Sequence, residues 1–390
     1  MSAPLVELGE FIMKGGGSVN PAKHPDEVFH LYSIPAYDSG RPDEVEGAEI
    51  GSNKNVVQGN DVLLSRIVPH IRRGWIVDAK NGHRQIASGE WIIFRSERFD
   101  PGYLRYHLLS DEFNRKLMRT IKGVGGSLMR ADPNQVAKFK IPLPPLPTQR
   151  RSAAVLDKAQ ALVANDRRTL AVYDQLAKSL FLEMFGDPVR NERGWPEKPL
   201  AEVVMPDKII TYGIVQAGPP QEDGVPYIRT GDIANGKILV DRLLRTTTEI
   251  AASYERSRCS AGDIVMSIRA TIGTTAIVPD SLDGVNLTQG TARISPDHSV
   301  VTTEYLHWAI KSDGIQMKID REAKGATFRE ITLTRLRDIP VPVPPLESQC
   351  RFSAMIKSYE VQRDLTETSL RRSEGLFGSL LQGAFSGGLG

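Results

Sequence analysis

The sequence predicts a mixed α/β protein built as a tandem duplication, with two globular domains of similar fold and one long helix after each. Three observations lead to this prediction. An unusual proline-rich segment occurs twice, as IPLPPLPTQRR at residues 141–151 and as VPVPPLESQCR at residues 341–351. Each copy is followed by a long stretch in which apolar residues recur with a helical period. The segments that precede the two copies also match one another, in the same order.

The first domain is expected to span residues 1–147. Strand-like runs bounded by glycine and asparagine, DVLLSRIV at 61–68 and EWIIFRS at 90–96, indicate a sheet. One helical stretch is expected from Tyr103 to Lys122. The domain should end at the proline-rich segment, because proline lacks a backbone donor and fixes φ, which stops both helices and strands.

The second domain is expected to span residues 188–346 and to repeat the first. LGEFI at 8–12 resembles LAEVV at 200–204, and GNDVLLS at 59–65 resembles AGDIVMS at 261–267. The runs DIVMSI and TTAIV read as strands. The helical stretch of the first domain returns as residues 305–324.

Each long helix is expected to begin at the hydroxyl residue after its proline-rich segment, Thr148 in the first copy and Ser348 in the second. Glycine often follows the last residue of a helix, so the first should end at Gly186 and the second at Gly383.

The two helices, at residues 148–187 and 347–390, carry apolar residues in alternating steps of three and four, as coiled coils do. A helix with one narrow apolar seam needs a partner, and the nearest candidate is the other helix. The expected seam residues are Leu156, Ala159, Val163, Leu170, Tyr173 and Leu180 in the first helix, and Ile356, Tyr359, Leu370, Phe377 and Leu380 in the second.

Composition favours a cytoplasmic protein. The N-terminal residues show no basic stretch followed by an apolar one, so no signal peptide is expected. No apolar run reaches the roughly 18 residues that a membrane-spanning helix needs, so no membrane partner is expected. Two cysteines, Cys259 and Cys350, are too few for a disulfide framework.

The chain resembles the specificity (S) subunits of type I restriction–modification systems over essentially its whole length. The resemblance rests on PLPPLPTQ and PVPPLESQ, each before a coiled-coil helix, and on VPYIRTGDIANGKI at 225–238. AGDIVMSIRATIGTTAIV and NLTQGTARI follow, then KGATFREITLTRLRDIPVPVPPL at 324–346. The first half departs from the pattern, because LYSIPAYDSG stands where a segment like PYIRTGDI is expected.

This resemblance implies two target recognition domains, each reading one half of a split, asymmetric site in double-stranded DNA. The two helices would pack antiparallel as a spacer between the halves. It also implies two methyltransferase (M) subunits, which would bind S-adenosylmethionine, and a restriction (R) subunit in the full complex. The S subunit itself would be non-catalytic and hold no cofactor.

The alternative is a DNA-modifying enzyme, either a methyltransferase or a nuclease, with unrecognised catalytic residues. An adenine methyltransferase should carry Asn/Asp-Pro-Pro-aromatic, and this sequence has no such step. A nuclease could use Asp280 with Glu322 and Lys324, but Thr120 stands in the first domain where Glu322 stands in the second. The histidines and cysteines show no metal-binding spacing. We therefore predict no catalytic and no metal-binding residue.

DNA contacts are expected from basic and amide side chains on loops, since these read base edges and hold phosphates. The net charge is only +2, yet residues 50–147 carry sixteen Lys and Arg against eight Asp and Glu. In contrast, residues 26–49 carry seven acids against Arg41 alone. For each residue the alternative is a solvated surface side chain. The candidates are Arg66, His70, Arg72, Arg73, Lys80, Arg84, Lys122, Ser127 and Arg130 in the first domain, and Arg229, Arg269, Gln289, Lys324, Thr327 and Arg329 in the second.

Overall fold

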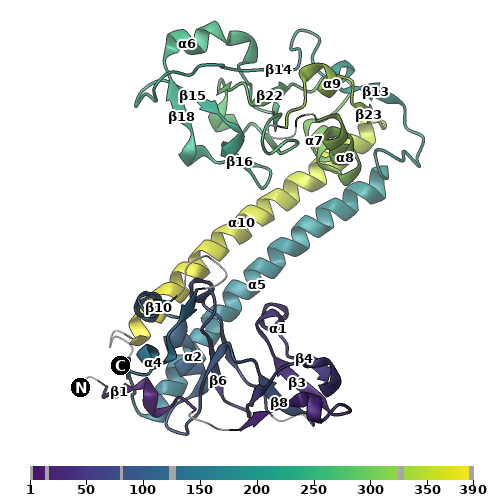
Figure 1. Ribbon diagram of the computed structural model, residues 1–390. Helices are drawn as coiled ribbons and strands as arrows, with labels where there is room; N and C mark the ends of the chain where they lie inside the picture. Colours follow the sequence, from purple (N-terminus) through teal and green to yellow (C-terminus); the bar gives the residue numbers. More distant parts are fainter. Residues whose placement is uncertain are drawn as a thin grey trace. The chain divides into compact units, whose positions relative to one another are not determined.

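A computed structural model of the chain describes residues 3–13, 17–79, 82–122, 129–323, 325 and 329–385 (Figure 1). The protein has the expected mixed α/β fold, and the chain divides into two compact units. The first unit consists of residues 1–168 with residues 367–390, and the second of residues 169–366. Each unit therefore contains one globular domain together with a part of each long helix.

The globular domain of the first unit contains two main sheets. The larger has the strand order β2-β5-β8-β3-β4, with strands Ser18–Val19, Lys54–Val56, Arg84–Ala87, Val28–Tyr32 and Asp43–Glu46. The smaller has the order β7-β6-β9, with strands Gly74–Ile76, Val62–Ser65 and Trp91–Phe94. All residues of β6 and β9 are buried, in keeping with their mostly apolar sequences VLLS and WIIF. Both runs were predicted as strands from the sequence, and the prediction is confirmed.

Shorter elements complete this domain. The first strand, β1 (Leu5–Glu7), pairs with the exit strand β12 (Lys140–Pro142), and β10 (Ile121–Lys122) pairs with β11 (Arg130–Ala131). The helices are α1 (Ile34–Ser39), α2 (Pro101–Leu109), α3 (Asp111–Met118) and α4 (Pro133–Val136).

The globular domain of the second unit repeats this plan. One sheet has the order β14-β22-β19-β20, with strands Thr211–Tyr212, Thr291–Ile294, Ile264–Ser267 and Thr275–Ile277. Another has the order β18-β15-β21, with strands Leu244–Thr246, Val225–Ile228 and Asn286–Leu287. β13 (Glu197–Pro199) pairs with the exit strand β23 (Pro340–Pro342), as β1 pairs with β12, and β16 (Ile233–Ala234) pairs with β17 (Lys237–Ile238). The helices are α6 (Thr248–Ser253), α7 (Thr303–Lys311), α8 (Asp313–Glu322) and α9 (Leu333–Arg337).

The single helical stretch predicted in each domain is in fact two helices. α2 ends before Ser110 and α7 before Ser312, and each serine is the N-cap of the next helix. The Ser110 hydroxyl accepts a hydrogen bond from the Phe113 amide, and the Ser312 hydroxyl accepts one from Ile315. A serine cap satisfies an amide that would otherwise lack a partner at the start of a helix, and so it favours a break at that position.

A buried glutamine has the same structural role in both copies of the proline-rich segment. Gln149 and Gln349 occupy the same position in the two copies, and both are fully buried. Oε1 of Gln149 accepts a hydrogen bond from the Asp100 amide (2.8 Å), while Nε2 donates to the carbonyls of Arg98 (3.1 Å) and Pro144 (2.7 Å). Gln349 makes the same three bonds, to Thr302, Val300 and Pro344. Each glutamine thus ties the start of a long helix to the cap of α2 or α7 and to the proline-rich segment.

We expect Gln149→Leu to destabilise the first unit by about 1–3 kcal/mol, because it removes the side-chain partner of three part-buried backbone groups. Gln349→Leu should do the same in the second unit. The measurement is the urea midpoint of unfolding. Gln175→Leu, on an exposed face of the same helix as Gln149, is the matched control. Midpoints that stay at the control value in both buried variants would contradict this role.

The two long helices are α5 (Leu146–Phe185) and α10 (Leu346–Phe385). Both begin two residues before the predicted hydroxyl caps, so the prediction of Thr148 and Ser348 as caps was wrong. A proline in the first turn, Pro147 in α5, costs little there because the first amides of a helix have no intrahelical partner. The first helix does end before Gly186, which has a left-handed φ of 77°.

The predicted end of the second helix at Gly383 was wrong, because α10 continues through this glycine to Phe385. Phe385 packs against Tyr103 and His107, with ring centroids 5.2 and 4.7 Å apart. This packing offsets the modest cost of a glycine inside a helix. No helix in the described part of the chain combines the length and hydropathy of a membrane span.

Contacts within each unit show that the helices run antiparallel. In the first unit Arg167 pairs with Glu374 at 2.7 Å, and Asp166 accepts hydrogen bonds from the hydroxyls of Ser369 and Ser373. In the second unit Asp174 pairs with Arg363 at 3.0 Å, and Phe181 packs on Phe352. Residue numbers rise along α5 while those of its partners fall along α10.

All predicted seam residues are buried or half-buried in the two helices. Leu156, Ala159, Val163 and Ile356 are buried, and Leu170, Tyr173, Leu180, Tyr359, Leu370, Phe377 and Leu380 are half-buried.

Equivalent aromatic residues of the two helices cover equivalent tyrosines. Phe185 of α5 lies 4.8 Å from Tyr305 of α7, and Phe385 of α10 lies 5.2 Å from Tyr103 of α2 (ring centroids). The hydroxyls of these tyrosines donate to the carbonyls of Pro342 (2.7 Å) and Pro142 (3.0 Å), respectively. The C-terminal end of α10 therefore packs on the globular domain of the first unit, and the C-terminal end of α5 packs on the globular domain of the second.

Candidate nucleic-acid interface

Three of the second-domain candidates lie around one open hollow of about 340 Å³. Arg229 follows strand β15, Arg269 follows β19, and Gln289 lies between β21 and β22. Tyr227, Thr230 and Thr288 also line the hollow, and sequence reasoning did not identify these three. The two sheets of this domain therefore bring guanidinium, amide, hydroxyl and aromatic groups around one hollow.

Arg229 is held rigidly by a buried carboxylate. Its Nε and Nη2 donate to the two carboxylate oxygens of Asp232, both at 2.8 Å, and Asp232 is 1% exposed. The same carboxylate accepts the Arg229 amide, and its hydrogen bond raises the pKa of the guanidinium above its usual value. Nη1 of Arg229 makes no hydrogen bond with any described residue. It can therefore donate to an acceptor on a bound ligand while Nε and Nη2 stay bonded to Asp232.

Gln289 has a free side-chain amide, while Arg269 is paired. The Gln289 backbone amide donates to the carbonyl of Ile214, but its side chain makes no hydrogen bond with any residue that the structure describes. An amide of this kind can pair with adenine through two hydrogen bonds. Nε of Arg269 lies 2.7 Å from a carboxylate oxygen of Glu330, and both side chains are 42% exposed.

In the first domain Arg66 and Arg130 converge on one carboxylate. Nη2 of Arg130 lies 3.0 Å from an oxygen of Glu90, and Nε of Arg66 lies 3.9 Å from the other oxygen. About a third of each of the three side chains is exposed. The sequence did not indicate this cluster, because Glu90 lies 40 residues before Arg130.

His70 and Arg72 lie on a tight turn after β6. His70 is exposed in a 3₁₀ turn, Pro69–Ile71, and the residues on both sides of it, Val68 and Arg72, have left-handed φ values of 46° and 48°. Such conformations cost energy in residues other than glycine and are concentrated at functional sites. Arg72 forms an ion pair with Asp111.

Arg73 and Arg84 have acidic partners within the domain. Arg73 makes a two-pronged bond to Asp38, at 3.0 and 3.1 Å, which lowers the pKa of that carboxyl group. Its side chain is only 11% exposed, so it can offer DNA little surface. Nη1 of Arg84 lies 3.8 Å from a carboxylate oxygen of Glu27.

The cations near the two domain exits are paired as well. Nζ of Lys122 lies 2.6 Å from Asp132, an ion pair that lowers the pKa of the Asp132 carboxyl group. Nη1 of Arg329 lies 2.9 Å from Asp320. The remaining candidates, Lys80, Ser127, Lys324 and Thr327, lie outside the described residues.

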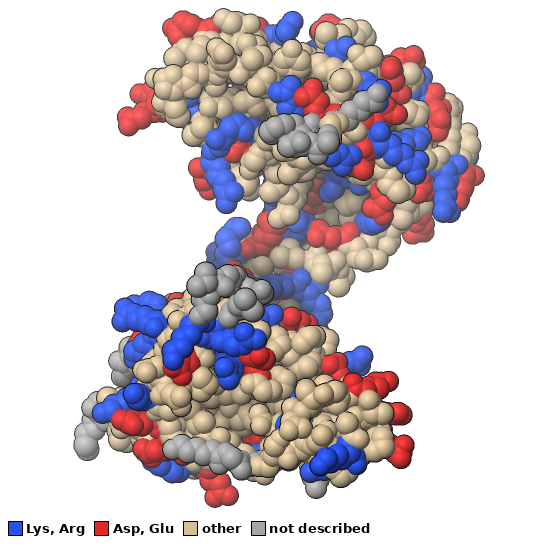
Figure 2. Space-filling model, viewed as in Figure 1, with Lys and Arg blue, Asp and Glu red and all other residues tan. Residues whose placement is uncertain are grey.

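Most of the candidate cations therefore meet an acid. On the face shown in Figure 2, Lys and Arg side chains are interspersed with Asp and Glu over both units. Exposed ion pairs of this kind contribute at most about 1 kcal/mol, so a DNA phosphate can replace the acid at small cost. The pairs hold the basic groups in place until such a ligand arrives.

The residues of the nuclease alternative have other partners. Glu322 pairs with Arg335 at 2.6 Å, and Lys324 lies outside the described residues. Among the described residues, the one group of three or more potential metal ligands is His30, Glu44 and His83, and it lies in the first domain.

Comparisons with known proteins agree with the duplicated architecture. Residues 209–372 match the family described as the type I restriction modification DNA specificity domain. The chain is 27% identical over 276 residues to the specificity subunit of the type I restriction enzyme EcoBI from Escherichia coli, across 64% of this chain and 58% of that protein. The chain thus spans less than two thirds of that relative's length.

Two further similarities cover more of the chain. The putative type I restriction enzyme MjaX specificity subunit of Methanocaldococcus jannaschii is 24% identical over 351 residues, across 86% of this chain and 78% of that protein. The crystal structure of a type I restriction–modification S subunit from M. genitalium has a similar fold, with a TM-score of 0.60 and 12% identity. That match covers 98% of this chain and 96% of the other.

Proposed function

We propose, because the chain belongs to the family of type I restriction–modification specificity subunits, that it is the DNA-reading subunit of such a complex. Each globular domain reads one half of a split site, and the paired helices α5 and α10 connect the two readers. The hollow around Arg229, Arg269 and Gln289 is the candidate base-reading surface of the second domain.

One observation carries the proposal that the two half-sites differ. An isolated β-bridge joins the turn after β6 to the segment before α4, and it pairs Ile67 with Arg130. The corresponding bridge of the second domain pairs Arg269 with Glu330. The same backbone bridge therefore presents an apolar and a basic side chain in the first domain, but a basic and an acidic side chain in the second. Base edges are read by side chains, so the two domains should read different sequences. Two unlike readers recognise an asymmetric site.

The partners follow from this role. We propose that two methyltransferase subunits dock on the chain, that they hold S-adenosylmethionine, and that a restriction subunit joins the full complex. The chain itself contributes no catalytic residue and binds no S-adenosylmethionine. The support for this is the family, together with the missing Asn/Asp-Pro-Pro-aromatic step in the sequence.

Calorimetry and a methylation assay test this division of labour. The purified chain should bind duplex DNA but not S-adenosylmethionine, and it should methylate DNA only when the methyltransferase subunits are added. The competing function, an enzyme with unrecognised catalytic residues, predicts cofactor binding or methyl transfer by the isolated chain. Either result would overturn the proposal.

A further inference from the structure

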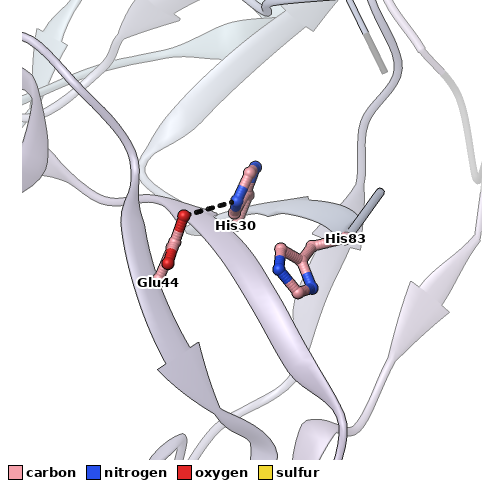
Figure 3. A group of neighbouring side chains, drawn as sticks. All are labelled: His30, Glu44 and His83. Atoms are coloured by element: carbon pink, nitrogen blue, oxygen red, sulfur yellow. Dashed lines mark hydrogen bonds and ion pairs between the residues drawn. The ribbon is translucent and has the colours of Figure 1, made fainter. Parts of the chain in front are cut away.

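Three side chains of the first domain that are far apart in the sequence lie together: His30, Glu44 and His83 (Figure 3). His30 lies in β3, Glu44 lies in the neighbouring β4, and His83 directly precedes β8 on the other side of β3. The register pairs His30 with Glu44 and with Gln85. Since side chains alternate along a strand, His83 lies on the same face as Gln85 and His30.

The spacing of the three groups suits a metal ion. Nε2 of His30 lies 3.2 Å from Oε1 of Glu44, and the His30 and His83 ring centroids are 5.0 Å apart. One ligand atom from each residue lies within 4.8 Å of the other two. Ligand atoms about 2.0–2.1 Å from a tetrahedral zinc ion are about 3.4 Å from one another. The first pair therefore already has this spacing, and a ring nitrogen of the half-buried His83 lies within 4.8 Å of both of the other ligand atoms.

We propose that His30, Glu44 and His83 bind one divalent transition-metal ion of the zinc class. Two imidazoles and one carboxylate match the preference of such ions, whereas Mg²⁺ and Ca²⁺ prefer oxygen ligands alone. Three protein ligands leave at least one coordination position for water. The bound ion would link side chains of β3, of β4 and of the residue before β8, at the β4 edge of the five-stranded sheet.

The charges around His30 favour a cation. His30 is 4% exposed, and its Nδ1 has no hydrogen-bond partner in the described part of the chain. Glu44 is therefore its one hydrogen-bond partner in that part of the chain. The segment 26–49, which contains His30 and Glu44, carries seven acids against Arg41, a charge balance that attracts cations.

Titration of the intact chain with Zn²⁺ by calorimetry, and with Co²⁺ by visible absorption, tests the site. We expect one ion per chain, ligand-field bands typical of nitrogen and oxygen ligands, and a thermal midpoint that rises with Zn²⁺ because the ion binds the folded state. Glu44→Gln keeps the size of the side chain and its hydrogen bond but removes the charged ligand. Glu44→Gln and His83→Ala should each weaken binding at least about tenfold, since even the loss of a second-shell partner of a metal ligand costs about 10–100-fold.

Two control variants separate this site from other ligands. His298→Ala removes an exposed histidine of the second unit, and Cys350→Ser removes the exposed thiol. Both should bind Zn²⁺ as the unmodified chain does. The proposal would be overturned by the absence of saturable binding, by unchanged affinity in Glu44→Gln and His83→Ala, or by loss of binding in Cys350→Ser. Equal competition by Mg²⁺ would also overturn it, because it would indicate an all-oxygen site.

Discussion

A chain truncated after residue 190 should form a homodimer that, with methyltransferase subunits, directs methylation to a palindromic split site. The truncated chain retains the first domain and α5 but lacks the part of α10 that belongs to the first unit. It therefore lacks Phe385, which covers Tyr103 and His107 in the intact chain. These aromatic groups would otherwise meet water, at a cost of about 25 cal/mol per Å² of apolar surface.

A second copy of the truncated chain can supply the missing cover. Phe185 is the counterpart of Phe385, and in the intact chain it already packs on Tyr305, the counterpart of Tyr103. In a two-fold pair, Phe185 of each copy would pack on Tyr103 of the other. An isologous pair presents the same reader twice, so the DNA site it selects must be a palindrome that repeats the first half-site.

Sedimentation at micromolar concentration and sequencing of the methylated DNA are the measurements. In the truncated chain, Phe185→Ala should raise the dimer dissociation constant on the order of 100-fold or more, since truncation of a buried phenylalanine costs about 3–5 kcal/mol. Leu176→Ala, at a position 44% exposed in the same helix, is the matched control and should leave the dimer intact. A well-folded monomer, or a dimer that is indifferent to Phe185→Ala, would contradict this account of the duplication.

Arg229→Ala should have two separable effects. It should reduce discrimination in the half-site read by the second domain by roughly 5- to 150-fold, the value of about 1–3 kcal/mol for one well-placed base contact. It should also destabilise the second unit by about 3–5 kcal/mol, because Asp232 would be left as a buried carboxylate without its cation.

A double variant distinguishes recognition from stability. In Arg229→Ala with Asp232→Asn the buried charge is gone, so stability should largely return while the discrimination stays lost. Gln289→Ala should lose discrimination at little cost in stability, because its side chain makes no hydrogen bond with any described residue. Arg190→Ala, 76% exposed beside Glu192, is the control cation. Equal losses for DNAs altered in either half-site would show that Arg229 supplies only a general positive field.

The sequence was sufficient to predict the elements whose signals are local or repeated. The strands at 61–68 and 90–96 could be recognised from their apolar runs, and the two proline-rich segments from their repetition. The break between α2 and α3 was missed, although Ser110 followed by Asp111 is a cap signal in the sequence. The helical residues on both sides of Ser110 make the two helices look like one in the sequence.

The candidate site could not be predicted in the same detail, because its geometry depends on residues far apart in the chain. Gln149 looks like an ordinary helix residue until the fold places Asp100 and Arg98 beside it. Glu90 joins Arg66 and Arg130, and β3 brings His30 beside His83, only through the pairing of strands. A list of basic residues therefore does not tell which side chains are already paired with acids.

Sequencing the DNA that is methylated by the intact chain together with its methyltransferase subunits tests the central claim most directly. The account predicts one site made of two different half-sequences at a fixed separation. Exchange of residues 1–147 for the corresponding domain of another family member should change one half-sequence only. Methylation of a single continuous sequence, or a site that stays unchanged after that exchange, would contradict the claim that each domain reads its own half.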